Sequence, residues 1–567
     1  MTGGRASFEI QTLRSERWVT EQVRETESAA RATAKTIFAK PQCAGIRILK
    51  NWTRSDGTVT ENVIHTETRQ IAEPKVAISS VDEAPYCRKT AEYYQLDSRM
   101  TVNRLFRKYI EKVYLTPTEL MHNYKALKKV QDEDSLFPSA VDRVATIQAN
   151  TTGEDARIRK EEIYRAVAKM TQRARKVEEV PNLPKLKGND FAKVIDRIEA
   201  VAPPDEVDFY SLVVLSQELT EHRSWLGKLE RLTSLTNPSQ RAEVLALLDG
   251  VIADLFGVPT ALQDVLGYQR NLAQALCAIA DLCDGRFTSK SDAKEQIDVL
   301  MPLIADGRLA ETRRSLMHRL LQQLSGGQAL NRSEPTRERE SFREVAERMC
   351  RSDGLLGGAE TAEALTRRYV FMMEEGGQAA LKKAVAGVVT TVPNPLFQVT
   401  YLTALAGSPI GPEVMKEICG VLRTVLGVRS IDALSSPGWP AKDKMLRLTR
   451  LYDLIAACEG LPEAERTAMT DTVDRILADF LKRQGIIEKL DDPAAPLRDR
   501  TTRLLEFCAA RVLPAASRSQ SLARERVVAI LRQPNFEMHF IEGITDPRRC
   551  EEMLRGLHAL LVRGGFR

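Results

Sequence analysis

The segment RAEVLALLDGVIADLF, residues 241–256, represents the leucine-rich pattern that decides the fold of this 567-residue chain. Related stretches lie on both sides of it, including NLAQALCAIADLC at 271–283 and RRSLMHRLLQQL at 313–324. Leucine, alanine, arginine and glutamate are strong helix formers, and aromatic residues make up only 6% of the chain. The pattern predicts almost no strand between residues 100 and 567. We expect a mostly α protein whose long body is an all-helical bundle or an irregular α-solenoid of stacked helix pairs.

The first 66 residues differ from this body because apolar and polar residues alternate there, as they do in half-buried strands. Thr26 begins a helical stretch that Pro41 ends, and Ser55-Asp56-Gly57 is a hairpin signal. The sequence therefore predicts a small α+β module with the order β-β-α-β-β over residues 1–70. Its expected strands are FEIQTL (8–13), RWVTEQV (17–23), GIRILKNW (45–52) and TVTENVIH (58–65).

Prolines, glycines and polar runs divide the remaining chain. Mixed polar residues with Pro74 and Pro85 favour a linker over residues 71–97, and Pro203-Pro204 marks a second break. The polar run NRSEPTRERE, residues 331–340, suggests another boundary. We therefore predict a basic helical segment at 98–180, a helical subdomain at 207–330, and one or more further helical subdomains at 341–567.

The sequence indicates an internal duplication when it is aligned with itself at an offset of 225 residues. Residues 241–256 then align with 466–481, and the match continues without a gap to Arg286 and Arg511. Seven identities fall within about fifty positions, among them Asp249 with Asp474 and Cys283 with Cys508. The spacing fits none of the short repeat periods of tetratricopeptide or ankyrin arrays. A duplication of helical units stays a hypothesis at this point.

The composition indicates a cytosolic protein of bacterial type. A hydrophobic fraction of 43% supports a folded core, and the odd number of nine scattered cysteines favours reduced thiols. The first residues contain no apolar run of the kind found in a secretory signal. Residues 384–412 carry no charged side chain, but Pro393 and Pro395 divide them into pieces too short to span a membrane. We expect two buried helices there, no membrane association and a cytoplasmic location.

Signatures of catalysis are absent from the sequence. It contains no phosphate-binding loop, no dinucleotide-binding glycine motif, no nucleophile elbow and no zinc-protease motif. None of the six histidines is spaced from another as helical metal ligands are. We therefore name no catalytic residue, no metal site and no cofactor.

Positive charge is concentrated between Arg99 and Val130, where eight basic and two acidic residues give a net charge of +6 against +5 for the whole chain. Thr116-Pro117-Thr118-Glu119 matches a helix capping box, so we predict two helices, 99–114 and 117–130, joined by a tight turn. The basic side chains form the best binding-site candidate. They are Arg104, Arg107, Lys108, Lys112, Lys125, Lys128 and Lys129, with Phe106, Tyr109, Tyr114 and Tyr124 interleaved.

Three interpretations of this basic stretch remain open. It could contact nucleic-acid phosphates, it could dock on an acidic protein surface, or it could be a solvated helix face over the core. Trp18 and Trp52 of the small module could mark a second contact surface, or could be core residues of a tiny domain.

The sequence favours a non-enzymatic interaction or regulatory scaffold with a protein partner, because extended helical bodies offer broad binding surfaces. A nucleic-acid-associated protein that uses residues 99–130 is the first alternative. An enzyme of unrecognised class, with a site in a cleft between subdomains, is the second.

Overall fold

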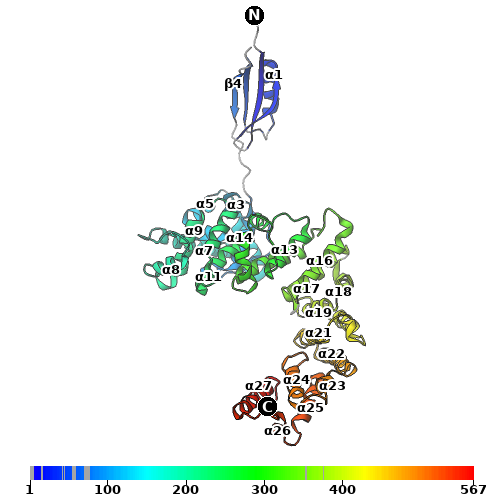
Figure 1. Cartoon of the computed structure of the whole chain (residues 1–567). Coiled ribbons are helices and arrows are strands. Elements are labelled where there is room, and N and C mark those ends of the chain that lie inside the picture. The colour runs from blue at the N-terminus through cyan, green and yellow to red at the C-terminus, as the bar shows by residue number, and fades with distance from the viewer. Residues whose placement is uncertain are drawn as a thin grey trace. The chain divides into compact units, whose positions relative to one another are not determined.

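The structure, a computed structural model, describes residues 5–14, 17–40, 43, 45–53, 59–68, 77–133, 135–351, 354–374 and 376–566. The chain divides into two compact units, Met1–Ile78 and Ser79–Arg567 (Figure 1). The boundary falls within the linker that the sequence predicts. The finer division of the helical body into subdomains stays a prediction.

The N-terminal unit has the predicted β-β-α-β-β order. Its elements are β1 (Arg5–Arg14), β2 (Arg17–Arg24), α1 (Glu27–Phe38), β3 (Gly45–Thr53) and β4 (Val59–Thr68). The strands form an antiparallel sheet in the order β2-β1-β3-β4, and α1 lies along one face of it (Figure 1). The predicted turn at residues 55–57 lies outside the described residues.

The alternating pattern explains the core of this unit, because every second strand residue faces α1. Phe8, Ile10, Ile46 and Ile48 are buried against Ala30 and Ala34 of the helix. Thr26 caps α1 as predicted, since its side chain accepts a hydrogen bond from the backbone N–H of Ala29 at 3.3 Å.

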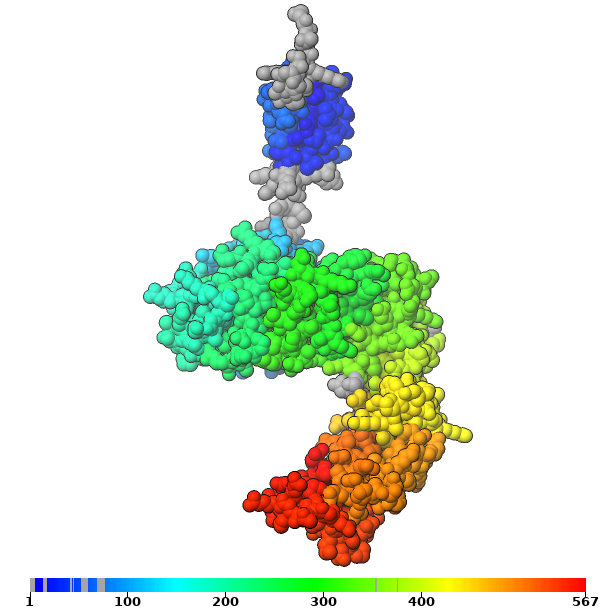
Figure 2. Space-filling view, viewed as in Figure 1, coloured from blue at the N-terminus to red at the C-terminus, as the bar shows by residue number. Residues whose placement is uncertain are grey.

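The second unit is helical, which confirms the predicted fold class. Its first half contains η1 (Thr90–Tyr94), α2 (Leu96–Leu105), α3 (Arg107–Val113), α4 (Pro117–His122), α5 (Tyr124–Asp132), α6 (Leu136–Thr152), α7 (Ala156–Glu178), α8 (Phe191–Glu199), η2 (Pro204–Glu206), α9 (Val207–Leu219), α10 (Trp225–Leu235), α11 (Ala242–Gly257), α12 (Pro259–Leu266), α13 (Leu272–Cys283), α14 (Lys294–Ala305) and α15 (Ala310–Ser325). In Figure 2 the parts of this unit follow one another in chain order, through green and yellow to red.

The second half of the unit continues in the same way. It contains η3 (Pro335–Arg337), α16 (Glu338–Met349), α17 (Gly358–Met372), α18 (Gly377–Thr391), α19 (Pro395–Ala406), α20 (Gly411–Leu426), η4 (Ile431–Ala433), α21 (Ala441–Ala456), α22 (Glu463–Gln484), α23 (Ile486–Leu490), α24 (Leu497–Ala509), α25 (Arg518–Leu531), α26 (Phe536–Phe540) and α27 (Pro547–Arg563). Its described strands are β5 (Cys350–Arg351) and β6 (Gly354–Leu355), a single short pair. The prediction of almost no strand after residue 100 is therefore confirmed for the described residues.

Helices α17 to α22 form a regular two-layer stack. Helices α17, α19 and α21 pack in sequence along one layer, and α18, α20 and α22 pack along the other. Each helix also packs on its neighbour across the layers, α17 on α18, α19 on α20, and α21 on α22 (Figure 1). This part of the chain has the arrangement of a solenoid of stacked helix pairs.

The uncharged stretch 384–412 contributes two helices to this stack. Val388 of α18 and Leu402 of α19 are fully buried. The break falls at the predicted prolines, where Asn394 caps α19 and Pro395 is its first residue. Among the described residues, no single helix has the length and apolar composition needed to cross a membrane, whereas α11 and α12 pass that test only together, as a pair bent by 92°.

The structure supports the duplication hypothesis. Under the 225-residue shift the residue ranges of α11, α12 and α13 align in order with those of α22, α23 and α24. In each set of three helices, an aspartate of the first helix caps the N-terminus of a later helix. Asp249 accepts hydrogen bonds from the backbone N–H groups of Glu311 and Thr312 at the start of α15. Asp474 accepts the same pair of bonds from Arg518 and Ser519 at the start of α25.

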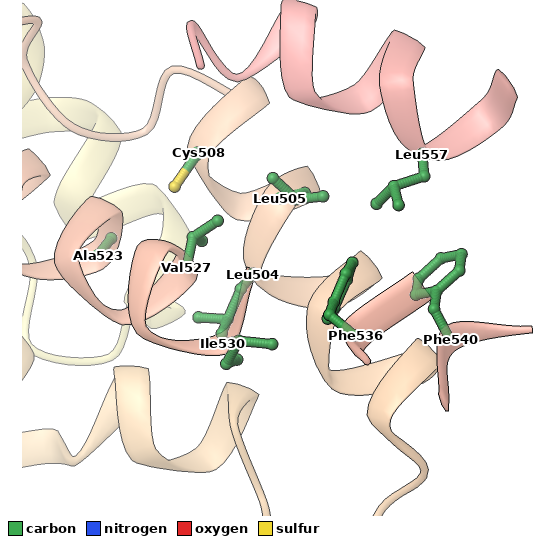
Figure 3. Close-up of a cluster of buried hydrophobic side chains, with 9 residues drawn as sticks. All are labelled: Leu504, Leu505, Cys508, Ala523, Val527, Ile530, Phe536, Phe540 and Leu557. Atoms are coloured by element: carbon green, nitrogen blue, oxygen red, sulfur yellow. The ribbon is translucent and has the colours of Figure 1, made fainter. Parts of the chain in front are cut away.

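Some of the packing around these helices is similar as well. Helix α13 packs on α15 and α16, as α24 packs on α25 and α27. The aligned residues Cys283 and Cys508 are both buried in their helices. Figure 3 shows Cys508 in the C-terminal core, which α24, α25, α26 and α27 fill with leucine, phenylalanine and other apolar side chains. All nine cysteine thiols of the chain are free.

Candidate functional site

The basic stretch folds into four short helices, α2 to α5, and not into the two that we predicted. The first predicted helix is interrupted at Phe106 and ends at Tyr114, which adopts a left-handed conformation. The second is interrupted at Asn123, whose extended backbone and side-chain bond to Ala126 N–H begin α5. Asparagine is a preferred N-cap, so its side chain competes with continuation of the helix.

The capping box between α3 and α4 is present as predicted. The backbone N–H of Glu119 donates to Thr116 Oγ1 at 3.2 Å, and the backbone N–H of Thr116 donates to Glu119 Oε2 at 2.8 Å. Pro117 occupies the first turn of α4. The box fixes the direction in which the chain leaves α3 and enters α4.

Six of the seven candidate basic side chains are exposed, and we call them the basic surface. They are Arg107, Lys108 and Lys112 of α3 and Lys125, Lys128 and Lys129 of α5. The outward position of the α5 lysines follows from the helical period, because Leu127 and Val130 of the same helix are buried.

Several of these cations have carboxylate neighbours, but at exposed positions. Arg107 Nε lies 3.4 Å from Glu111 Oε1, Lys125 Nζ lies 3.4 Å from Glu178 Oε1, and Lys128 Nζ lies 2.9 Å from Asp132 Oδ1. Exposed pairs of this kind contribute little to stability and exchange readily with water. Lys108 and Lys129 form no ion pair with any residue that the structure describes. The basic surface therefore retains positive charge that a partner can neutralise.

Arg99 contributes to the charge of the sequence stretch but not to this surface. Its guanidinium is buried, with Nε 2.9 Å from Asp254 Oδ1 and Nη2 2.5 Å from Glu311 Oε2. It also donates to the carbonyl oxygen of Tyr94 at 2.7 Å. This arginine joins α2 to α11 and α15 inside the unit.

The interleaved aromatic residues face inward for the most part. Phe106 and Tyr109 are buried, and Tyr124 packs beside the core formed by α7 and α9. Tyr114 is 37% exposed, but its ring centroid lies 5.4 Å from that of the buried Trp225. The surface consequently lacks the row of exposed rings on which nucleic-acid bases stack.

Arg104 has a different environment from the other candidates. It is half-buried and lines a cavity together with Arg107 of α3 and with His318 and Arg319 of α15. The sequence did not indicate His318 and Arg319 as site residues, because they lie more than 200 residues further along the chain. Their segment carries an ordinary leucine-rich pattern, and no local spacing distinguishes them.

The two candidate aromatic residues of the small module lie on its sheet. Trp18 is half-buried, with the Arg47 guanidinium carbon 4.7 Å from its ring centroid. Trp52 is 41% exposed, with Lys50 Nζ 5.9 Å from its ring centroid. Neither is a fully buried core residue, and their role as contact residues stays a prediction.

No group of three or more histidine, cysteine, aspartate or glutamate side chains is arranged to hold a metal ion within the described part of the chain. His122, for example, is buried, and its Nδ1 lies 2.8 Å from the carbonyl oxygen of Thr118. Comparisons of the chain with protein-family models, with curated proteins and with solved structures found no match.

Proposed function

We propose that this chain is a non-enzymatic cytosolic scaffold, interacting or regulatory, that binds an acidic protein partner through the basic surface. The observation that carries the proposal is the exposure of six cationic side chains on α3 and α5, while most of the aromatic residues between them face inward. Such a surface attracts carboxylates by charge and offers no row of exposed rings on which bases stack. The solenoid-like stack that follows supports a scaffold, because such stacks expose a large area for their length.

Nucleic acid is the main competing ligand, since lysine side chains also neutralise phosphates. The short helices weigh against it. Helix α3 contains seven residues and α5 contains nine, and Asn123 separates α4 from α5. Neither has the length of a recognition helix that fills a major groove.

The test compares two double variants of equal charge change. Lys108→Glu/Lys129→Glu reverses the two lysines of the basic surface that have no described ion pair. Lys442→Glu/Lys482→Glu reverses two exposed lysines of α21 and α22 and serves as the matched control. Both variants lower the net charge of the chain by the same amount. A difference in binding between them therefore depends on where the reversed lysines lie and not on the net charge.

The first measurement uses defined probes: a poly-glutamate peptide, duplex DNA and single-stranded RNA of similar length. We expect the peptide to bind, and we expect Lys108→Glu/Lys129→Glu to slow its association about tenfold while the control variant stays near wild type. Tighter binding of DNA or RNA than of peptide, with a salt slope that falls by about one unit for each lost contact, would favour the nucleic-acid alternative.

The second measurement identifies the partner. Proteins are captured from native cells on the wild-type chain and on both variants and are quantified by mass spectrometry. The proposal predicts an acidic protein that is lost on Lys108→Glu/Lys129→Glu and retained on Lys442→Glu/Lys482→Glu. Equal capture of proteins by the wild type and both variants would mean that the basic surface is only a solvated helix face.

A further inference from the structure

A polar cavity of about 240 Å³ lies between α2, α3, α11 and α15. Three arginines line it, Arg104 from α2, Arg107 from α3 and Arg319 from α15, together with His318. Three serines, Asn103 and two glutamines add uncharged polar groups to the lining. The cavity thus gathers cations from three helices that the sequence separates widely.

The lining contains little opposing charge. Asp254 is its single carboxylate among the described residues, and both oxygens of that carboxylate are already used. Oδ1 accepts from Arg99 at 2.9 Å, while Oδ2 accepts from the backbone N–H and the hydroxyl of Thr118 at 2.7 and 2.6 Å. Arg99 therefore neutralises Asp254, whereas Arg107 Nε lies 3.4 Å from the carboxylate of Glu111 outside the lining.

Two of these arginines have unused donors. Arg104 Nε is buried and has no hydrogen-bond partner among the described residues. Arg319 reaches the carbonyl oxygen of Gly257 at 3.5 Å, the outer limit for a hydrogen bond. Neither side chain forms an ion pair with a residue that the structure describes. Guanidinium donors that are withdrawn from water without an anion are costly, which indicates that a ligand completes the site.

Electrostatics at the site supports the same conclusion. Burial and the positive charge of Arg107 lower the pKa of Arg319 to about 10, far below the usual range for arginine. Burial and the charge of Arg104 lower the pKa of His318 as well. In both groups burial is the larger cause, and the neighbouring arginine adds to it.

We propose that this cavity binds a small tetrahedral oxyanion of the phosphate class, either free or as the head of a small phosphate monoester. The planar guanidinium fork pairs with two oxygens of such an anion at once. The size also fits, because pockets for larger organic ligands usually enclose about 300–1,000 Å³. The cavity is a different site from the basic surface proposed for protein docking, although Arg107 belongs to both.

The test uses the full chain, with inorganic phosphate and glycerol 3-phosphate as probes and sodium chloride at equal ionic strength as the reference. Thermal unfolding and titration calorimetry measure binding. We expect saturable binding and a higher melting temperature with at least one of the two phosphates over chloride. Binding of glycerol 3-phosphate in preference to inorganic phosphate would identify a monoester ligand, and the reverse would identify the free anion. Equal effects of phosphate and chloride, or no saturable binding, would overturn the proposal.

Two variants locate the binding. Arg104→Gln and Arg319→Gln each remove one charged donor, and each should weaken phosphate binding about tenfold or more. Lys129→Gln on the basic surface is the control and should bind as wild type does. Phosphate binding that is equal in all three variants would place the anion elsewhere and reject the site.

The same variants carry a second readout that does not depend on a ligand. In phosphate-free buffer, Arg104→Gln and Arg319→Gln should melt at or above the wild-type temperature, because each relieves repulsion among unpaired cations. A large fall in their melting temperature without phosphate would mean that these arginines already have internal partners, and would contradict the inference.

Discussion

Lys228 of α10 and Glu119 of α4 form an ion pair in the interior of the helical unit. Lys228 Nζ lies 2.5 Å from Glu119 Oε1, and neither side chain has any exposed surface. Lys228 also donates to the carbonyl oxygen of Leu219 at 2.6 Å, and the other oxygen of Glu119 closes the capping box of α4. Burial raises the pKa of Glu119 and lowers the pKa of Lys228, while their mutual attraction opposes both shifts.

This pair predicts a strongly non-additive double-mutant cycle. Lys228→Met leaves a buried carboxylate without its cation and should lower the free energy of unfolding by about 3–5 kcal/mol. Lys228→Met combined with Glu119→Gln should recover most of that loss, because the glutamine is neutral and still accepts the Thr116 N–H. Urea unfolding of Lys228→Met, Glu119→Gln and the double variant measures the coupling. A double variant no more stable than Lys228→Met alone would contradict this account.

His122 predicts a loss of stability in acid. Burial lowers its pKa to about 3, whereas an unfolded histidine titrates near 6.5, about the usual value. Above about pH 6.5 the ring is neutral in both the folded and the unfolded state, so its contribution to the free energy of unfolding is complete. Below that pH the unfolded chain binds the proton first, so the free energy of unfolding falls by up to about 1.4 kcal/mol for each pH unit.

The measurement compares the pH dependence of urea unfolding for the wild type and His122→Gln. The variant loses the packing of the imidazole against Phe209, whose ring centroid lies 4.8 Å away, and should be less stable at neutral pH. Its stability should nevertheless vary less between about pH 5 and pH 7. Parallel pH profiles of the two proteins would show that His122 does not titrate as described.

The uncharged segment 384–412 predicts a position-specific response to lysine. Val388→Lys places a charge at a fully buried site and should lower the free energy of unfolding by more than about 3 kcal/mol. Ala386→Lys lies on the exposed side of the same helix and should change it by less than about 0.5 kcal/mol. Chemical denaturation checks both values. Similar small effects at the two positions would show that the helix is not packed as described.

The aligned aspartates Asp249 and Asp474 predict matching losses. Asp249→Ala removes the cap of α15 and Asp474→Ala the cap of α25, and each should lower the free energy of unfolding by about 2 kcal/mol. The control is Asp479→Ala, because this residue is exposed although it aligns with the buried Asp254. Asp479→Ala should change the free energy of unfolding by less than about 0.5 kcal/mol. A loss at only one of the two caps would count against the duplication hypothesis.

The sequence by itself determined the features that depend on neighbouring residues. Alternation predicted the strands of the N-terminal module, Thr26 predicted the start of α1, and Pro393 with Pro395 predicted the break between α18 and α19. The capping box at Thr116 was predicted for the same reason, since its hydrogen bonds join residues three apart. These interactions form within one or two helical turns, so the order of residue types is sufficient to indicate them.

Tertiary structure alone decided which basic residues are available to a ligand. Arg99, Arg104 and Lys129 look alike in the sequence, yet the first is paired inside the unit, the second lines a cavity and the third is exposed. The partners that separate them, such as Asp254 and Arg319, lie more than 150 residues away in the chain. Local patterns carry no information about such contacts, because the packing of distant helices brings the charges together and removes them from water.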